Sequence, residues 1–258
     1  MLKLVTILSL LTLISCVPIS PEDQKTDFER ADTHYRVALA NLQANNPTGA
    51  LSELLSAVKL NPENAVIQVT LAQTYQKKKA YPQAEKHYLK ALQLSDNDPR
   101  YQNNLASLYL DMEEWDKAIY YFDQAAHNLL FVDTPVSIAG KGYAYFKKND
   151  FQMALGYLNE SIELAPRYAS PYFFKSMIYH AMGNTDKEKI ALQRAIKIEP
   201  KFLEPRYQLA LLLAKENLLD EASEQLEAII EYSPSTAMSF KAEDLLKTLS
   251  GSCKRSGN

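Results

Sequence analysis

The sequence predicts an all-α protein: a solenoid of six helical hairpins followed by a capping helix at the C-terminus. Three observations support this. Small residues return at a spacing of 34 residues, prolines return at the ends of the same units, and only 7 of the 258 residues are glycine. Folds that need many tight turns, such as β-sandwiches or glycine-looped nucleotide-binding folds, are therefore disfavoured.

The first element is a signal sequence over residues 1–15. Lys3 gives it a basic start, and an apolar run of eleven residues follows from Leu4 to Ile14. A membrane-spanning helix needs roughly 20 such residues, whereas the apolar region of a signal peptide needs about 7–15. The sequence Leu13-Ile14-Ser15-Cys16 resembles the bacterial lipobox. The resemblance implies cleavage before Cys16, with diacylglycerol and an N-acyl chain such as palmitate attached to it. The alternative is an ordinary signal peptide that happens to contain a cysteine.

Residues 16–30 are expected to be the lipidated cysteine and a tether, because Pro18, Pro21 and several polar residues interrupt the apolar pattern. In bacterial lipoproteins an aspartate directly after the cysteine retains the protein on the inner membrane, and Val17 stands at that position. The analogy implies a Gram-negative outer-membrane lipoprotein, anchored by its lipid on the periplasmic face.

The repeats follow the tether. Ala57, Ala91, Ala125, Ser161, Ala195 and Ile229 stand 34, 34, 36, 34 and 34 residues apart. This spacing resembles the tetratricopeptide repeat, a right-handed superhelical array with two antiparallel helices in each unit. The six units cover residues 31–64, 65–98, 99–132, 135–168, 169–202 and 203–236. Each first helix also has one small residue where the two helices come closest: Ala38, Ala72, Ala106, Gly142, Ser176 and Ala210.

Prolines end four of the second helices, at Pro62, Pro166, Pro200 and Pro234. The pattern has three departures. Asp96 replaces the proline of unit two, Glu188 replaces an alanine of unit five, and two residues are added before unit four. We expect looser packing at these places. A helix over residues 237–250 is predicted to cap the array, and a flexible tail over 251–258 follows it.

The first helices of such an array line its concave face. The candidate groove residues form a largely apolar, aromatic-rich set: Tyr35, Leu39, Leu42, Val69, Asn103, Tyr143, Phe146, Phe173, Met177 and Tyr207. Amphipathic helices or extended apolar peptides bind such surfaces, and aromatic anchors supply most of the binding energy. The alternative for any single residue is that it belongs to the core.

Other classes of function find no support in the sequence. The four histidines lie in different units, and none forms a metal-ligand pair. No nucleophile elbow or phosphate loop is present, so we expect no catalytic residue, no metal and no small-molecule substrate. Lys and Arg number 28 against 31 Asp and Glu. That balance gives no cationic field for nucleic acid.

A lipobox followed by six repeats resembles the pilotins, the PilF/PilW-type lipoproteins of type IV pilus biogenesis. The segment from Asp98 to Tyr109, with Asn103 and Asn104, resembles the double-asparagine first helix of that family. The expansion before Gly142 falls where the family also expands. The resemblance implies a protein that binds the secretin subunit of a type IV pilus and promotes its outer-membrane localisation and multimerisation. The alternative is an outer-membrane scaffold for cell-wall hydrolases or proteases.

Overall fold

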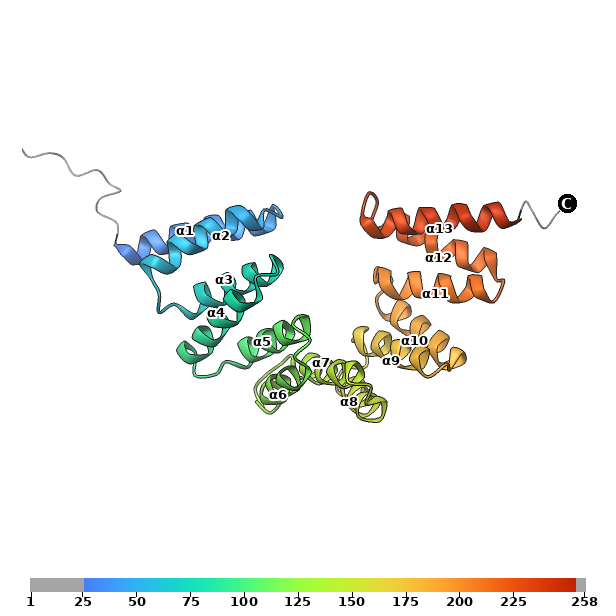
Figure 1. Ribbon diagram of the computed structural model, residues 1–258, viewed down its shortest axis with the longest axis horizontal. Coiled ribbons are helices and arrows are strands. Elements are labelled where there is room, and N and C mark those ends of the chain that lie inside the picture. The colour runs from blue at the N-terminus through green and yellow to red at the C-terminus, as the bar shows by residue number, and fades with distance from the viewer. Residues whose placement is uncertain (1–25, 254–258) are drawn as a thin grey trace, which may run out of the picture.

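The structure, a computed structural model, describes residues 26–253, which form thirteen α-helices and no strand. Twelve of them pair into six antiparallel hairpins, which stack into a right-handed superhelical solenoid that bends into a U (Figure 1). The first helices are α1 (Asp27–Gln43), α3 (Ala65–Lys77), α5 (Pro99–Asp111), α7 (Thr134–Lys147), α9 (Ser170–Ala181) and α11 (Leu203–Lys215). The second helices are α2 (Pro47–Leu60), α4 (Tyr81–Leu94), α6 (Trp115–Ala126), α8 (Phe151–Leu164), α10 (Thr185–Ile198) and α12 (Leu219–Tyr232). The predicted fold class is confirmed.

Small residues allow the two helices of each hairpin to approach closely. Ala38 on α1 and Ala50 and Ala57 on α2 are all completely buried, and equivalent residues are buried in the later hairpins. In the fourth hairpin the first-helix position is Gly142. A Cβ there would lie 3.0 Å from Leu158 Cγ on α8. The regularly spaced small residues that identify the repeat are therefore those at which the two helices of a hairpin touch.

The turn inside each hairpin uses one left-handed residue. Asn45, Lys79, Glu113, Asn149, Gly183 and Asn217 all have φ between 53° and 69°. The next residue then donates its N–H to a carbonyl five residues earlier, as Ala80 does to Tyr75 at 2.9 Å and Glu114 does to Tyr109 at 2.9 Å. This is the Schellman ending of a helix, and it favours glycine because a Cβ strains the left-handed conformation.

The prolines lie two residues beyond the ends of their helices. The residue before each one has a non-helical conformation, as at Asn61 with φ −137° and ψ 76°, because a following proline disfavours helical geometry. After α4, which lacks the proline, the helix ends instead with two left-handed residues, Asp96 and Asn97.

The proline segments are also tied to the next hairpin. Gln68 donates from Nε2 to the Pro62 carbonyl at 2.6 Å, and Arg206 donates from Nε to the Pro200 carbonyl at 2.7 Å. These two residues occupy equivalent places in their repeats and are both buried. The Gln68 side chain also contacts His87 Nδ1 at 2.7 Å. Burial lowers the pKa of the His87 imidazole, and the nearby Lys86 lowers it further, which favours the neutral ring in this contact.

The junction before unit four is not loosened. Helices α6 and α7 contact each other more extensively than other successive hairpins do. Gly140 on α7 allows this, because the ring of Phe122 from α6 occupies the space that a Cβ at Gly140 would fill. Helices α6 and α7 are therefore closely packed, and the expectation of looser packing here is wrong.

The ends of the array differ slightly from the predicted segments. Helix α1 begins at Asp27, inside the expected tether over 16–30, because Thr26 forms a capping box with Glu29. Helix α13 (Ala237–Cys253) packs on α12 as the cap and continues three residues into the expected tail over 251–258. The signal sequence over 1–15 and Cys16 lie outside the described residues. Within residues 26–253 no helix is both long enough and apolar enough to cross a bilayer.

Glycine at the left-handed position is expected to stabilise the turns. Glu113→Gly should raise the free energy of unfolding by about 0.5–1 kcal/mol, since a non-glycine residue there costs roughly 1–2 kcal/mol and glycine's extra chain entropy offsets part of this. Gly183→Ala, at φ 69° with open space around the Cβ position, should lower it by about 1 kcal/mol. Urea denaturation measures both, and shifts of the same sign would contradict this account.

The α6–α7 contact makes a second prediction. Gly140→Ala should lower the free energy of unfolding by about 1–3 kcal/mol, because the added methyl group displaces the Phe122 ring. The matched control is Gly156→Ala on α8, where a Cβ meets nothing within 4 Å. There the better helix propensity of alanine should raise stability by about 1 kcal/mol. Equal effects of the two changes in thermal unfolding would show that the contact is not tight.

Candidate functional site

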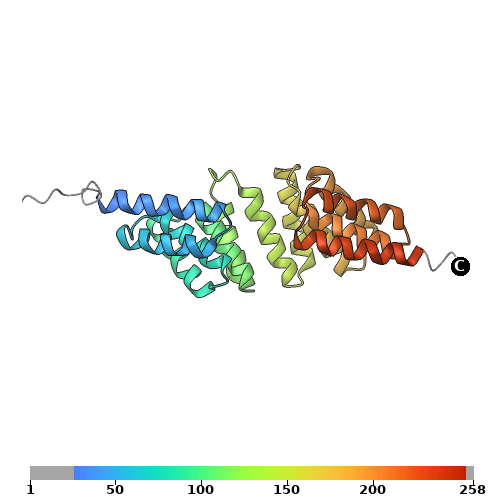
Figure 2. The same ribbon diagram turned by 90° about the horizontal axis from the view of Figure 1, so that it is seen from above.

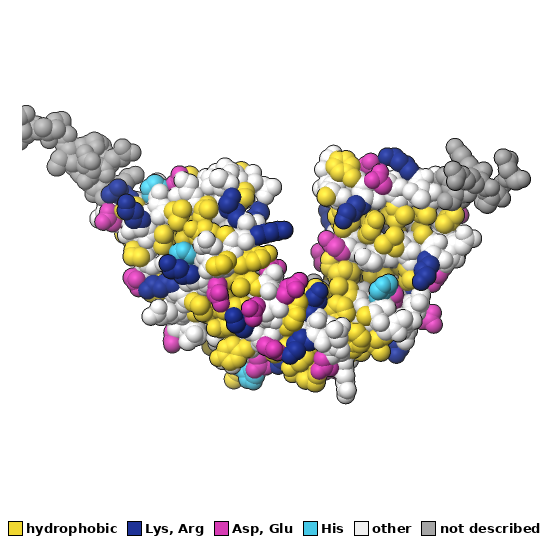
Figure 3. Space-filling view, in the orientation of Figure 1, with side chains coloured by type: hydrophobic (Ala, Val, Ile, Leu, Met, Phe, Trp, Pro, Cys, Tyr) yellow, Lys and Arg dark blue, Asp and Glu magenta, His cyan; other side chains and the backbone are white. Residues whose placement is uncertain are grey.

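The inner face of the U is the candidate binding surface. At its base α5 and α7 lie on the inner side, and α6 and α8 lie outside (Figure 1). The space between the two arms is hollow, and apolar side chains are exposed along both walls (Figure 3). At the base of the U, the first helices α5 and α7 thus lie beside the concavity (Figure 1).

Three of the predicted groove residues meet in one pocket. Phe146 on α7 and Phe173 and Met177 on α9 line a pocket of about 340 Å³, together with residues from α10 and α11. Ligand pockets in proteins typically measure about 300–1,000 Å³, so this one is near the lower limit. Its size suits a single side chain of a bound segment better than a whole helix.

The aromatic residues around this pocket form a continuous run. The Tyr143 ring centroid lies 6.0 Å from that of Phe146 and 4.8 Å from that of Phe174. Phe174 continues the run to Phe173, and Phe173 reaches Phe202 at 5.3 Å. Such ring contacts hold one another in position, which gives the wall of the pocket a fixed shape.

A carboxylate lies among these apolar groups. Glu188 of α10 occupies the position at which the other five hairpins have a fully buried alanine, and it lines the same pocket. Only 9% of its side chain is exposed, whereas that of His180, which contacts it at 3.0 Å, is 74% exposed. In the sequence, Glu188 stands out only as a departure from the repeat. A charged residue at a position where the repeat pattern predicts a buried helix contact is the sequence signal that could have indicated a binding site here.

The remaining predicted groove residues are spread along the array. Tyr35, Leu39 and Leu42 are half-buried on α1, at the opposite end from the pocket. The Tyr35 hydroxyl lies 3.4 Å from Thr70 Oγ1 of α3. Tyr207 on α11 packs against the α12–α13 cluster. None of these four residues lines the pocket.

Two predicted groove residues serve internal packing instead. Val69 is only 6% exposed, because it lies in the core cluster shared by α3 to α7. Its place in the groove set is therefore corrected. Asn103 is half-buried, and its Oδ1 accepts a hydrogen bond from Ser137 Oγ at 2.8 Å. That bond joins α5 to α7, so the asparagine contributes to stacking.

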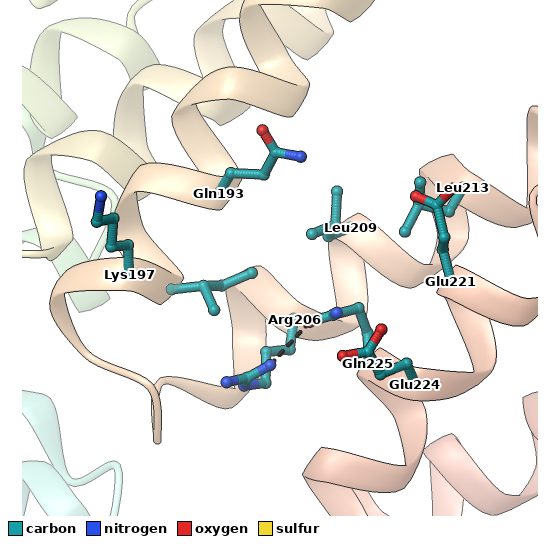
Figure 4. A pocket seen from close by; sticks show the side chains of 9 residues that line it. Gln193, Lys197, Arg206, Leu209, Leu213, Glu221, Glu224 and Gln225 are labelled. Atoms are coloured by element: carbon teal, nitrogen blue, oxygen red, sulfur yellow. Dashed lines mark hydrogen bonds between the residues drawn. The ribbon is translucent and has the colours of Figure 1, made fainter.

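A second pocket, of about 250 Å³, lies among α10, α11 and α12 (Figure 4). Its central cation, Arg206, is 9% exposed and donates to the Pro200 carbonyl and to Gln225 Oε1 at 2.8 Å. The guanidinium also lies 5.3 Å from the Tyr232 ring centroid. The guanidinium group of Arg206 thus has its partners within the protein. We therefore infer that the residues of this pocket serve the stacking of hairpins and do not bind a ligand.

A further apolar surface, not predicted from the sequence, lies at the junction of the third and fourth hairpins. In the connection between α6 and α7, Leu129, Leu130 and Val132 are 100%, 90% and 89% exposed. Phe131 is turned inward and is 9% exposed. The connection projects beyond the neighbouring helices (Figure 2). The run of four apolar residues at the expanded junction was visible in the sequence, but nothing in it distinguished the anchoring residue from the exposed ones.

The two kinds of residue in this connection should respond differently to substitution. Leu129→Ser combined with Leu130→Ser should change the free energy of unfolding by no more than about 0.5 kcal/mol, because neither side chain is packed. Phe131→Ala should lower it by about 3 kcal/mol through the cavity left behind. A large loss of stability in the double serine variant would show that the leucines are packed in solution.

Within the part of the chain that the structure describes, no group of three or more His, Cys, Asp or Glu side chains is placed to hold a metal ion. The site consists of a groove, an aromatic pocket and one buried carboxylate. Such an arrangement can bind a protein segment.

Comparison with known sequences agrees with this architecture. Tetratricopeptide repeat models match residues 63–127, 137–168 and 169–202. Subunit 6 of the anaphase-promoting complex of Arabidopsis thaliana is 24% identical over 154 residues, covering 58% of this chain and 28% of that protein. The chain spans about a third or less of the length of its first curated relatives, which include a human protein O-mannosyl-transferase. The protein is a tetratricopeptide repeat protein, and this fold is typically a non-catalytic scaffold for binding proteins.

Two solved structures resemble the array over nearly their whole length. PilW, described as a widely conserved type IV pilus biogenesis factor, superposes with a TM-score of 0.67 at 18% identity, covering 82% of this chain and 97% of that one. PilF of Pseudomonas aeruginosa superposes with a TM-score of 0.63 at 17% identity, covering 84% and 99%. At these identities the likeness shows the fold alone.

Proposed function

We propose that this protein is an outer-membrane lipoprotein that acts as the pilotin of a type IV pilus. Its lipid, on Cys16, holds it at the periplasmic face of the outer membrane. Its groove binds a secretin subunit and promotes the multimerisation of that subunit there. The protein carries out no chemical reaction of its own.

One observation carries the proposal. The lipobox-like sequence Leu13-Ile14-Ser15-Cys16 precedes a six-hairpin array that matches the PilW and PilF chains almost from end to end. The helical hairpin alone is common to many repeat proteins. The proposal is supported by the combination of a lipobox-like sequence with six hairpins and a cap.

The aromatic pocket supplies the binding step of the proposed mechanism. An apolar secretin segment would lie along the first helices, with its anchoring side chain between Phe146 and Phe173. Aromatic anchors in a preformed pocket provide most of the energy of such interfaces. The rings already contact one another in the free protein, so little ordering is needed on binding.

The proposal predicts the state of the secretin in outer membranes. In a strain lacking this protein, an unheated gel probed for the secretin should show loss of the high-mass multimer and accumulation of monomer. Cys16→Ser should release the protein from the outer membrane and have the same effect. Unchanged multimer in the deletion strain would contradict the proposal and favour a scaffold for other envelope proteins.

Groove and outer-face variants give the matched comparison. Tyr143→Ala with Met177→Ala removes two side chains of the inner face, and we expect at least a fivefold loss of multimer. Tyr120→Ala with Met153→Ala removes the same two residue types from the exposed surfaces of α6 and α8 and should leave the multimer unchanged. Thermal unfolding of both proteins verifies that each remains folded.

A further inference from the structure

The position of Glu188 is unusual for this fold. Ala50, Ala84, Ala118, Ala154 and Ala222 occupy the equivalent positions and are fully buried where the two helices of a hairpin touch. The glutamate side chain is larger than the methyl group of alanine, and it lines the pocket beside Phe173 and Met177 of α9.

This places a carboxylate where few groups compensate its charge. Burying a charged group is costly unless an opposite charge or hydrogen bonds compensate it. Within the described residues, the side-chain hydrogen bond of Glu188 joins its Oε1 to His180 Nδ1 at 3.0 Å. That imidazole is mostly in solvent, where ion pairs contribute little. No lysine or arginine lines the pocket.

The rest of the pocket is suited to a cation with an apolar stem. Phe146 and Phe173 present aromatic surface, which attracts cations and also packs against methylene groups. Gln208 of α11 adds a polar group at the wall. The volume of about 340 Å³ is suited to one long side chain.

We propose that this pocket binds a lysine or arginine side chain of the bound protein segment, with Glu188 as the counter-charge and Phe146 and Phe173 around the stem. The inference rests on the proposed function only for the identity of the partner. The groove would then recognise a segment that is apolar over most of its length and carries one basic residue.

The test uses two small molecules of the same shape and different charge, n-butylguanidinium and n-butylurea. Titration of the full protein is followed by the NMR signal of the Met177 methyl group, assigned with Met177→Leu. The guanidinium compound should bind at least tenfold more tightly than the urea. Equal binding of the two compounds would overturn the proposal.

The experiment is completed by two variants, each of which removes one negative charge. Glu188→Gln keeps the shape of the side chain and should abolish the tenfold preference, whereas Glu160→Gln, on the exposed surface of α8, should retain it. A preference that survives Glu188→Gln would overturn the assignment. The titration does not involve the secretin, so its result is independent of the outer-membrane gel. Each of the two proposals can therefore fail alone.

Discussion

The close approach of two helices within each hairpin is the constraint on which the rest of the structure depends. It requires residues such as Ala38 and Ala50, which are completely buried at the contact. With so little side-chain volume between the paired helices, the larger apolar residues are turned towards the neighbouring hairpins. No hairpin can bury these residues by itself, so stacking and a cap at α13 follow from the same constraint.

The candidate functional features lie where the chain departs from the regular repeat. Glu188 breaks the alanine pattern and brings a charge to the concave face. The two added residues before α7 produce a connection in which Phe131 anchors three exposed aliphatic neighbours. A regular repeat has identical surroundings at every unit, so departures from regularity give one unit a chemistry that the others lack.

The sequence predicts the repeat register well, because helix contact and helix termination depend on local residue types such as Ala57 and Pro62. It predicts the groove less well. Phe146 and Val69 both belong to first helices, yet Phe146 lines a pocket and Val69 is buried. The difference arises from the local stacking of adjacent hairpins, which no single repeat encodes. The direction of the Glu188 side chain likewise depends on the space that α9 leaves beside it.

The extensive contacts of the array join helices that are adjacent along the chain, with weaker ones between alternate helices. Such a protein has a low contact order, since its extensive contacts join residues that are close together in the sequence. Each hairpin can pack on the preceding one as soon as it has been synthesised. Helix α13 follows α12, so the apolar surface of the sixth hairpin is covered only after α13 has been synthesised.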